Sequence, residues 1–583
     1  MIGTIFFTAG QAAREGVISM NPIFGEKDNT LINMTLGDLL DRVALLFPDN
    51  DGIAYFDRPF HVTYKGFKEN CDRVARGLLS IGVGKGSHVA IWATNYPEWI
   101  LLMFATAKIG ATLITVNTNY KIFEAEYLLR QSDTDTLVMM HGLKDTCYVD
   151  IVNELCPELA ESEFGKLDSA VLPRLKRVIY IDKEEDTPKG MMHWSKLYDL
   201  AENVSEEERA ALQRTVMPDD VVNMQYTSGT TGFPKGVMLT HYGILNNGKC
   251  IGDNQKLTSR DRVCLPVPFF HCFGCVLGIM ACVTHGSAII PVERFNPIRV
   301  MDTIQGMRCT ATYGVPTMYI AMLEQPTFKN YDFSTLRTGI MSGSPCPIKV
   351  MEQVMETMHM SEITIPYGMT ETSPVCTMTN TEDGIDKRVS TVGRGMPFIE
   401  VKVVDPETHA DIPANTPGEV VVRGYSVMKG YYNMPEATKN AIDAEGWYHS
   451  GDLATVDDEG YFHITGRIKD MIIRGGENIY PKEIEEFLYT CPKVKDVQVI
   501  GVPDSNYGEE VCACIVLKDP GSMTEQDVKD LVKANMARHK VPRYVWFMDA
   551  FPMTASGKIQ KYKMREAAVE HFNLGDAANI ETA

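Results

Sequence analysis

This 583-residue chain lacks both long apolar runs and an excess of basic residues. No apolar stretch approaches the length of about 20 residues that a membrane-spanning helix needs, so we expect no integral membrane association. Lysine and arginine number 56 against 76 aspartates and glutamates, which gives a net charge of −20. This acidic balance argues against binding to nucleic acid or to an anionic membrane surface.

The sequence also lacks internal repeats, low-complexity tracts and a secretory signal. Its first residues, MIGTIFFTAGQAAR, contain an apolar stretch that is short and has no basic region before it. The 14 cysteines are scattered along the chain. We therefore expect reduced thiols in a cytoplasmic protein rather than a disulfide framework.

The first half of the chain has the periodicity of alternating helices and strands. Helices are expected at Tyr64–Ser80, Trp99–Ile109 and Glu202–Leu212, and strands at His88–Ala93, Ala111–Val116 and Val221–Tyr226. This β-α-β-α order predicts an α/β fold in which helices cover sheets rich in parallel strands.

The pattern changes near Gly466. Before it, the segments Gly418–Gly424 and Ala454–Thr465 read as short paired strands of a β-rich subdomain. After it, we expect helices at Pro481–Leu488 and Glu525–Met536, and strands at Val497–Val502 and Val511–Leu517. The sequence thus predicts an N-terminal domain at residues 1–466, a hinge at 467–469 and a small mobile α+β domain at 470–583.

The most informative segment is Tyr226-Thr-Ser-Gly-Thr-Thr-Gly-Phe-Pro-Lys-Gly236. Its glycines permit close backbone approach to an anion, its hydroxyls donate to phosphate oxygens, and Lys235 supplies a positive charge. A polar surface loop is the alternative, because small hydroxylated residues are common in turns. The segment is not a Walker loop, since Pro234 precedes the lysine and Gly236 follows it.

This segment resembles the signature of the acyl-adenylate-forming (ANL) superfamily, and further motifs of that superfamily follow in its order. They are Tyr367-Gly-Met-Thr-Glu371, Gly446-Trp-Tyr-His-Ser-Gly-Asp452, Gly466-Arg-Ile-Lys-Asp470, Gly475-Gly-Glu-Asn-Ile-Tyr-Pro481 and Pro552-Met-Thr-Ala-Ser-Gly-Lys558. The resemblance covers nearly the whole chain. Among subfamilies it is strongest to AMP-forming medium-chain acyl-CoA synthetases and bacterial fatty-acid CoA ligases.

The resemblance implies a set of ATP-binding residues. They are Thr227, Ser228, Gly229, Thr230, Thr231, Gly232, Lys235, Gly343, Ser344, Pro345, Tyr367, Gly368, Met369, Thr370, Asp452 and Arg467. Glu371, assisted by Thr227, would bind Mg²⁺, and Thr370 would hydrogen-bond the α-phosphate. Asp452 would accept from the ribose hydroxyls, although an aspartate at such a place is also typical of an Asx-turn.

The resemblance also implies how the C-terminal residues take part. Lys558 would stabilise charge as the adenylate forms, whereas a lysine in such a turn is ordinarily a solvated surface residue. Lys469 matches the pivot of a domain rotation. After that rotation, residues of one loop would line a tunnel for coenzyme A: Arg474, Gly475, Gly476, Glu477 and Asn478.

A weakly charged run from Pro266 onward contains Cys272-x-x-Cys275 and His271. A zinc site is the tempting interpretation, but no distant partner pair accompanies this motif, and the apolar composition favours a buried helix. By resemblance His271 would lie beside the reacting carboxylate, with a core histidine as the alternative. The expected walls of the acyl pocket are Phe270, His271, Cys275, Tyr313, Gly314, Met341 and Val375.

These features predict an AMP-forming ligase that joins a medium-sized carboxylic acid to coenzyme A through an acyl-adenylate. ATP, Mg²⁺ and coenzyme A are the expected cofactors, and the catalytic residues would be Lys558, Glu371, His271 and Thr370. Transfer of the acyl group to a carrier protein is one alternative. A nucleotide-binding regulator without turnover is another. The sequence leaves open whether the chain forms a homodimer.

Overall fold

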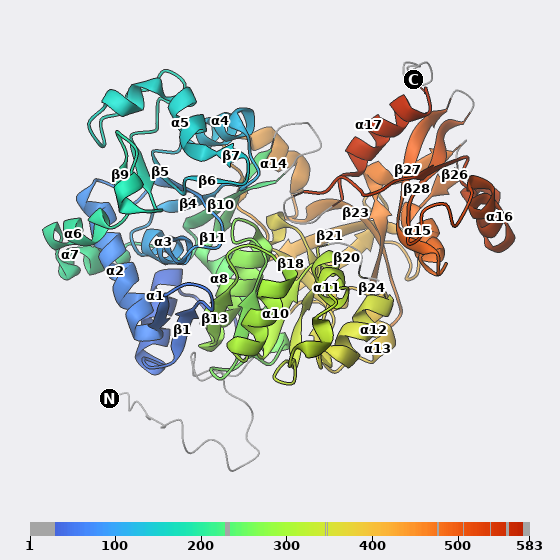
Figure 1. The fold of residues 1–583 in the computed structure, drawn as a ribbon, viewed down its shortest axis with the longest axis horizontal. Helices are drawn as coiled ribbons and strands as arrows, with labels where there is room; N and C mark the ends of the chain where they lie inside the picture. Colours follow the sequence, from blue (N-terminus) through green and yellow to red (C-terminus); the bar gives the residue numbers. More distant parts are fainter. Residues whose placement is uncertain are drawn as a thin grey trace, which may run out of the picture.

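The computed structural model describes residues 30–227, 234–343, 346, 348–474, 477–504, 507–536, 538–554 and 559–574, and at 477–478 the backbone alone. The chain forms a large N-terminal part and a smaller C-terminal part, which lies at one end of the molecule in Figure 1. The mixed α/β architecture expected from the sequence is confirmed.

One large sheet has eight strands in the order β22-β11-β10-β4-β3-β5-β8-β9. Its strands are β3 (His88–Trp92), β4 (Thr112–Thr115), β5 (Thr136–Met139), β8 (Arg177–Tyr180), β9 (Met192–His193), β10 (Val221–Thr227), β11 (Lys235–Thr240) and β22 (Gly430–Tyr431). Neighbours from β10 to β9 are parallel, whereas β11 is antiparallel to both β10 and β22. The phosphate-loop sequence begins in β10 and ends in β11.

A second sheet has seven strands in the order β16-β15-β14-β12-β13-β1-β2. Its strands are β1 (Asp51–Ala54), β2 (His61–Thr63), β12 (Arg262–Leu265), β13 (Ala288–Pro291), β14 (Ala311–Gly314), β15 (Thr338–Met341) and β16 (Glu362–Thr364). All neighbours are parallel except β1 and β2.

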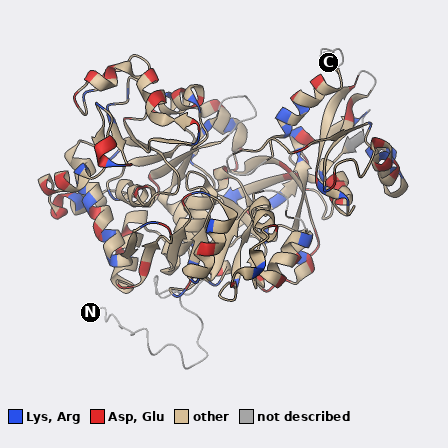
Figure 2. Ribbon diagram, viewed as in Figure 1, with Lys and Arg blue, Asp and Glu red and all other residues tan. Residues whose placement is uncertain are grey.

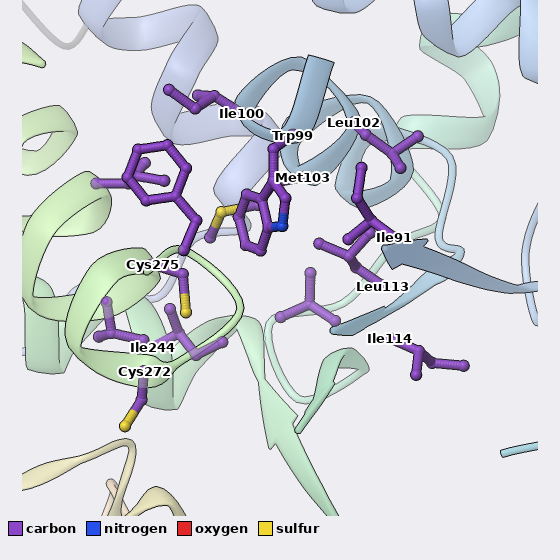
Figure 3. Packing of buried hydrophobic residues seen from close by; sticks show 14 of the residues in the cluster. Ile91, Trp99, Ile100, Leu102, Met103, Leu113, Ile114, Ile244, Cys272 and Cys275 are labelled. Atoms are coloured by element: carbon purple, nitrogen blue, oxygen red, sulfur yellow. The ribbon is translucent and has the colours of Figure 1, made fainter. Parts of the chain in front are cut away.

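Helices buried among these strands form the core. They are α1 (Leu36–Leu46), α2 (Tyr64–Ser80), α3 (Pro97–Lys108), α8 (His241–Asn254), the π-helix η4 (Phe273–Met280) and α9 (Ala281–His285). The helix expected at Tyr64–Ser80 has those bounds, with Thr63 as its N-cap. Figure 3 shows Trp99 of α3 and Cys275 of η4 in one apolar cluster with strand residues Ile91 and Leu113. The same cluster contains Val263 and Leu265 of β12, so residues from both sheets share one hydrophobic core.

The described residues of the large part form nine further α-helices, of which α4, α5 and α6 also contribute buried residues to this core. They are α4 (Ile122–Gln131), α5 (Tyr148–Leu155), α6 (Lys196–Leu200), α7 (Glu206–Gln213), α10 (Pro297–Gly306), α11 (Pro316–Leu323), α12 (Ile348–Thr357), α13 (Ile385–Ser390) and α14 (Pro435–Ala441). The prediction of one continuous helix at Glu202–Leu212 is wrong. Ser205 caps a new helix there, with Glu208 completing a capping box, so a 3₁₀ turn at Ala201–Asn203 precedes α7.

Two smaller sheets carry the later motifs. One has the order β20-β21-β23-β24, with β20 (Ile399–Val404), β21 (Gly418–Gly424), β23 (Tyr448–Val456) and β24 (Phe462–Arg467) all antiparallel. The other is formed by β17 (Pro366–Gly368), β18 (Val375–Met378) and β19 (Arg394–Gly395). The segment expected as strand at Ala454–Thr465 is divided between β23 and β24 by a turn at Gly460, whose φ is +84°.

The C-terminal part is an α+β unit, as expected. Its sheet contains β25 (Ile472–Arg474), β26 (Glu477–Ile479), β27 (Val494–Asp504), β28 (Gly508–Leu517) and β29 (Tyr544–Phe547), and β29 is parallel to β28. Helices α15 (Pro481–Tyr489), α16 (Glu525–Asn535) and α17 (Lys561–His571) accompany it. It has its own apolar clusters on the two faces of the β27–β28 pair.

Charged side chains lie mainly on the outer helices of both parts, and the centre of the molecule carries few of them (Figure 2). All 14 cysteines are described and all are free thiols. Among the described helices, none combines the length and the apolar character that crossing a bilayer requires.

Candidate nucleotide and acyl site

The ends of the phosphate-loop sequence lie at the mouth of the β10–β11 hairpin, where Thr227 pairs with Lys235. Thr227 Oγ1 donates to Glu371 Oε1 at 3.2 Å, and Tyr431 OH donates to the same oxygen at 3.0 Å. Lys235 Nζ lies 4.8 Å from the centre of the Tyr431 ring. The two residues expected to bind Mg²⁺ are thus neighbours, although 144 positions separate them in the chain. Ser228, Gly229, Thr230, Thr231 and Gly232 lie outside the described residues.

Both ends of this loop are attached to helix α4. Tyr127 OH donates to the carbonyl oxygen of Pro234 at 3.0 Å, after the loop. Tyr226, before the loop, donates its hydroxyl to the Gln131 side chain, and Gln131 Nε2 donates to Tyr432 O at 2.8 Å. Since Tyr127 and Gln131 lie one turn apart on one helix face, α4 fixes the separation of the loop ends.

A second group gathers around Asp452, which is buried on β23. Its Oδ2 accepts from Tyr367 OH at 2.9 Å, and its Oδ1 accepts from Arg467 Nε at 2.9 Å. Burial and the Asp452 carboxylate raise the pKa of Tyr367 well above its usual range, so its hydroxyl stays a donor. The Asp452 charge likewise raises the pKa of Arg467. Three residues expected at the nucleotide are therefore brought together.

Thr370 links the nucleotide residues to the expected acyl pocket. It is buried at the start of the 3₁₀ turn Thr370–Thr372, and its Oγ1 lies 3.7 Å from Cys272 Sγ. The neighbouring His271 is half-buried, and its Nδ1 accepts from the backbone N–H of Phe273 at 3.1 Å. In the neutral ring the proton is then on Nε2, from which it can be donated to a carboxylate.

The Cys272-x-x-Cys275 segment lies in the apolar core (Figure 3). Cys275 Sγ accepts from Gln225 Nε2 at 3.1 Å, and burial raises the pKa of its thiol. Across the described part of the chain, the group of three or more potential metal ligands is His409, Glu419 and His449, and it includes neither cysteine. The segment forms the buried helix η4, as its composition indicates.

The other expected pocket walls are mostly buried. Phe270 is 9% exposed, whereas Tyr313, Met341 and Val375 are at most 2% exposed. Tyr313 stacks on Phe273 with ring centres 6.4 Å apart. Gly314 and Met341 face each other at the ends of β14 and β15. Met341 belongs to a different apolar cluster from Tyr313 and Val375, and the register of β14 with β15 puts Met341 and Tyr313 on opposite faces of the second sheet.

Two expected nucleotide glycines have clear steric roles. A Cβ on Gly368 would lie 1.8 Å from the Pro374 carbonyl oxygen, so no other residue fits there. Gly343 has a φ of +93°, a conformation that favours glycine. Met369, between β17 and the 3₁₀ turn, packs against the main core cluster. Ser344 and Pro345 lie outside the described residues.

Of the residues expected to act from the C-terminal part, the structure describes Lys469 and Arg474 in full. Lys469 is exposed in the 3₁₀ turn Ile468–Asp470 that follows β24. Arg474 makes a two-bond ion pair with buried Glu510, at 2.7 and 2.9 Å, and lies over the Tyr507 ring. Gly475, Gly476 and Lys558 lie outside the described residues, as do the side chains of Glu477 and Asn478.

Among the described residues, few polar contacts connect the C-terminal part with the rest. Lys482 Nζ donates to the carbonyl oxygen of Ile464 at 2.7 Å, and Lys495 lies 3.9 Å from the Glu324 carboxylate. Both lysines are partly exposed, so these contacts contribute little to the free energy that fixes the two parts together. Such an interface is compatible with a change of relative orientation.

Sequence reasoning missed Tyr431, Tyr127 and Gln131. Each acts through a contact with a residue that is distant in the chain, and no local periodicity reports such a contact. The sequence does contain two successive tyrosines, Tyr431 and Tyr432, directly after Gly430. Such a pattern is too common to identify these residues as part of a site.

Known proteins resemble the chain over nearly all of its length. Residues 40–432 match the family described as AMP-binding enzyme, and residues 483–558 match the AMP-binding enzyme C-terminal domain. The putative acyl-CoA synthetase YngI of Bacillus subtilis (strain 168) is 54% identical, with 94% of this chain and 99% of the relative covered. The mitochondrial medium-chain acyl-CoA ligase ACSF2 of Bos taurus is 40% identical, with 93% and 89% covered. The crystal structure of ATP-bound MatB from Rhodopseudomonas palustris superposes with a TM-score of 0.78 at 28% identity, over 92% of this chain and 100% of MatB.

Proposed function

Since the chain belongs to the AMP-binding enzyme family, we propose that it works as an AMP-forming acyl-CoA synthetase that joins a medium-chain or similar-sized acid to coenzyme A. The observation that carries this proposal is the meeting of Thr227 and Glu371 beside the hairpin that bears the phosphate loop. Relatives named as acyl-CoA synthetase and medium-chain acyl-CoA ligase support the reaction and the acid class.

In the first half-reaction a carboxylate attacks the α-phosphorus of ATP, and the protein must align two anions. Glu371 and Thr227 present oxygen atoms 3.2 Å apart, which suits Mg²⁺, a cation that prefers oxygen ligands. When bound, the cation neutralises phosphate charge. Tyr431 holds Glu371 in place, and Thr370 donates to the α-phosphate.

The nucleoside is held at Asp452. Its carboxylate accepts from the ribose hydroxyls, while Arg467 and Tyr367 keep it oriented. The Nε2–H group of His271 donates a hydrogen bond to the acid carboxylate, which stays ionised and lies along the wall formed by Phe270 and by Cys275 of η4. Lys558 comes from the C-terminal part to the carboxylate and α-phosphate.

The second half-reaction needs a thiol to reach the adenylate carbonyl. We divide the chain into an N-terminal domain at 1–466, a hinge at 467–469 around Lys469, and a C-terminal domain at 470–583 that rotates between the two steps. The weak contacts of Lys482 and Lys495 support this division. The Glu510 pair holds Arg474 at the start of the loop that would line the coenzyme A path.

The test is exchange of labelled pyrophosphate into ATP with acids from acetate to palmitate, followed by acyl-CoA formation. We expect the highest turnover with medium-sized acids. Lys558→Ala should abolish exchange and spare thioester formation from supplied adenylate, whereas the control Lys563→Ala should change neither. No exchange with any acid would indicate a nucleotide-binding regulator. Exchange without acyl-CoA formation would indicate transfer to a carrier protein.

A further inference from the structure

Three side chains that adenylation does not use gather where β21 meets β23. Potential ligand atoms of His409, Glu419 and His449 all lie within 4.8 Å of one another. The two imidazole rings are 4.5 Å apart between centres and inclined by 43°. We propose that these residues bind one divalent cation of the zinc class, because two imidazole nitrogens and a carboxylate oxygen suit zinc and leave a position open for water.

The hydrogen bonds of His449 support a cation on its Nδ1. That nitrogen lies 2.9 Å from Glu419 Oε2. Its Nε2 is buried and has no hydrogen-bond partner among the described residues, although Asp443 Oδ2 lies 3.6 Å away. If the ring is neutral and donates from Nδ1 to Glu419, its Nε2 carries no proton. Two hydrogen-bond acceptors, Nε2 and the Asp443 carboxylate, then face each other.

A cation on Nδ1 removes this conflict. The ring proton then lies on Nε2 and faces the Asp443 carboxylate 3.6 Å away, so a small approach of the two groups gives the usual outer arrangement of a carboxylate, a histidine and a metal. The separation of 2.9 Å between Nδ1 and Glu419 Oε2 corresponds to an angle of about 90° at a cation bound at about 2.1 Å from each. A protonated imidazole between the two carboxylates is the competing explanation.

His409 supplies the third ligand from an exposed turn between β20 and β21. Its φ is +57°, in the left-handed region that histidine enters more often than most residues other than glycine. The turn is fixed by a backbone hydrogen bond of 2.9 Å from His409 N to Asp405 O. Because the side chain is exposed, it can approach the Glu419–His449 pair without disturbing packed residues.

The cluster is connected to the nucleotide residues through Glu419. Its second oxygen, Oε1, accepts from the backbone N–H of Gly451 at 2.9 Å, and Gly451 precedes Asp452. Ser450 Oγ accepts from Asp452 N at 3.0 Å in the same turn. A cation on Glu419 therefore acts on the turn that orients Asp452, and we expect its occupancy to change the affinity for nucleotide.

The test is titration of the metal-free full-length protein with Zn²⁺ alone, followed by calorimetry and by metal content after dialysis. His409→Asn is compared with His359→Asn, because both histidines are exposed and have left-handed φ values, +57° and +59°, which asparagine tolerates. We expect the unmodified protein and His359→Asn to bind one equivalent. His409→Asn should lose at least tenfold in affinity, and Asp443→Asn about 10- to 100-fold.

Co²⁺ in place of Zn²⁺ distinguishes this site from the free thiols, since only cysteine ligands give thiolate charge-transfer absorption. Such absorption would overturn the proposal by placing the metal on cysteine ligands. Equal Zn²⁺ affinity in His409→Asn and the unmodified protein, or no binding at all, would overturn it in favour of the protonated imidazole. His409→Asn should keep normal acyl-CoA synthesis in metal-free buffer supplemented with Mg²⁺. Zn²⁺ binding is measured without turnover, so its failure leaves the proposed reaction untouched.

Discussion

Replacing Tyr431 by phenylalanine removes one hydroxyl from the centre of the proposed site. Tyr431 is 7% exposed, and its OH donates to Glu371 Oε1 at 3.0 Å. Burial and the Glu371 carboxylate raise the pKa of Tyr431, so the hydroxyl is a proton donor at every pH used for assays. Phenylalanine fills the same space, and the change therefore isolates one hydrogen bond.

The size of the effect follows from the charge of the acceptor. A hydrogen bond to a charged group contributes about 1.5–3 kcal/mol. If Tyr431 orients Glu371 for Mg-ATP, its loss should slow adenylation between about 10- and 150-fold at limiting Mg²⁺. Thr227 still contacts Glu371, so part of the orientation remains.

The assay is acid-dependent exchange of pyrophosphate into ATP over a range of Mg²⁺ concentrations. Tyr432→Phe is the matched control, because its neighbouring hydroxyl donates at 2.9 Å to Asp133, on the α4 side of the hairpin. We expect Tyr431→Phe to need more Mg²⁺ and Tyr432→Phe to behave normally. An unchanged Mg²⁺ dependence in Tyr431→Phe would refute the role given to this contact, as would equal defects in both variants.

Three further changes test other parts of the structure. Tyr127→Phe removes a neutral hydrogen bond of about 1 kcal/mol to the phosphate-loop end, so the KM for ATP should rise about fivefold while thioester formation from supplied adenylate stays normal. Asp452→Asn removes the negative charge of the carboxylate that Arg467 and Tyr367 both contact, so ATP binding measured by calorimetry should weaken about 30-fold. Unchanged binding would contradict the ribose role. Burial raises the pKa of Glu98 to about 6, so the proton that stabilises the fold at low pH is lost as pH rises through 6, at a cost of about 2 kcal/mol. Glu98→Gln should flatten the dependence of Tm on pH between 5 and 8, and a dependence equal to that of the unmodified protein rules this out.

Local patterns predicted much of the fold. The helix Tyr64–Ser80 and the strand Gly418–Gly424 have the expected bounds, because their apolar periodicity and their flanking residues act within the segment. The helix expected at Glu202–Leu212 failed where Ser205, a strong N-cap, competed with a continuous charged pattern. Most residues of the candidate site were predicted from the family motifs and their order along the chain, and not from apolar periodicity.

Long-range contacts were beyond such reasoning. Nothing in the sequence around Tyr431 indicates that its hydroxyl meets Glu371, 60 positions earlier. The same holds for Tyr127 and Pro234, which are 107 positions apart. These pairings depend on the order of strands in the eight-stranded sheet, and strand order is a property of the whole chain.

The bond between Asp452 and Arg467 has a mechanical consequence. The two residues are register partners on adjacent strands, and Arg467 is the last residue of β24, two positions before Lys469. A ligand that donates hydrogen bonds to the Asp452 carboxylate shares this acceptor with the Arg467 guanidinium, which weakens the pull of the carboxylate on Arg467. Because the chain leaves the large part directly after Arg467, ribose binding at Asp452, as proposed, changes the contacts of the residue that anchors the segment leading to the C-terminal part.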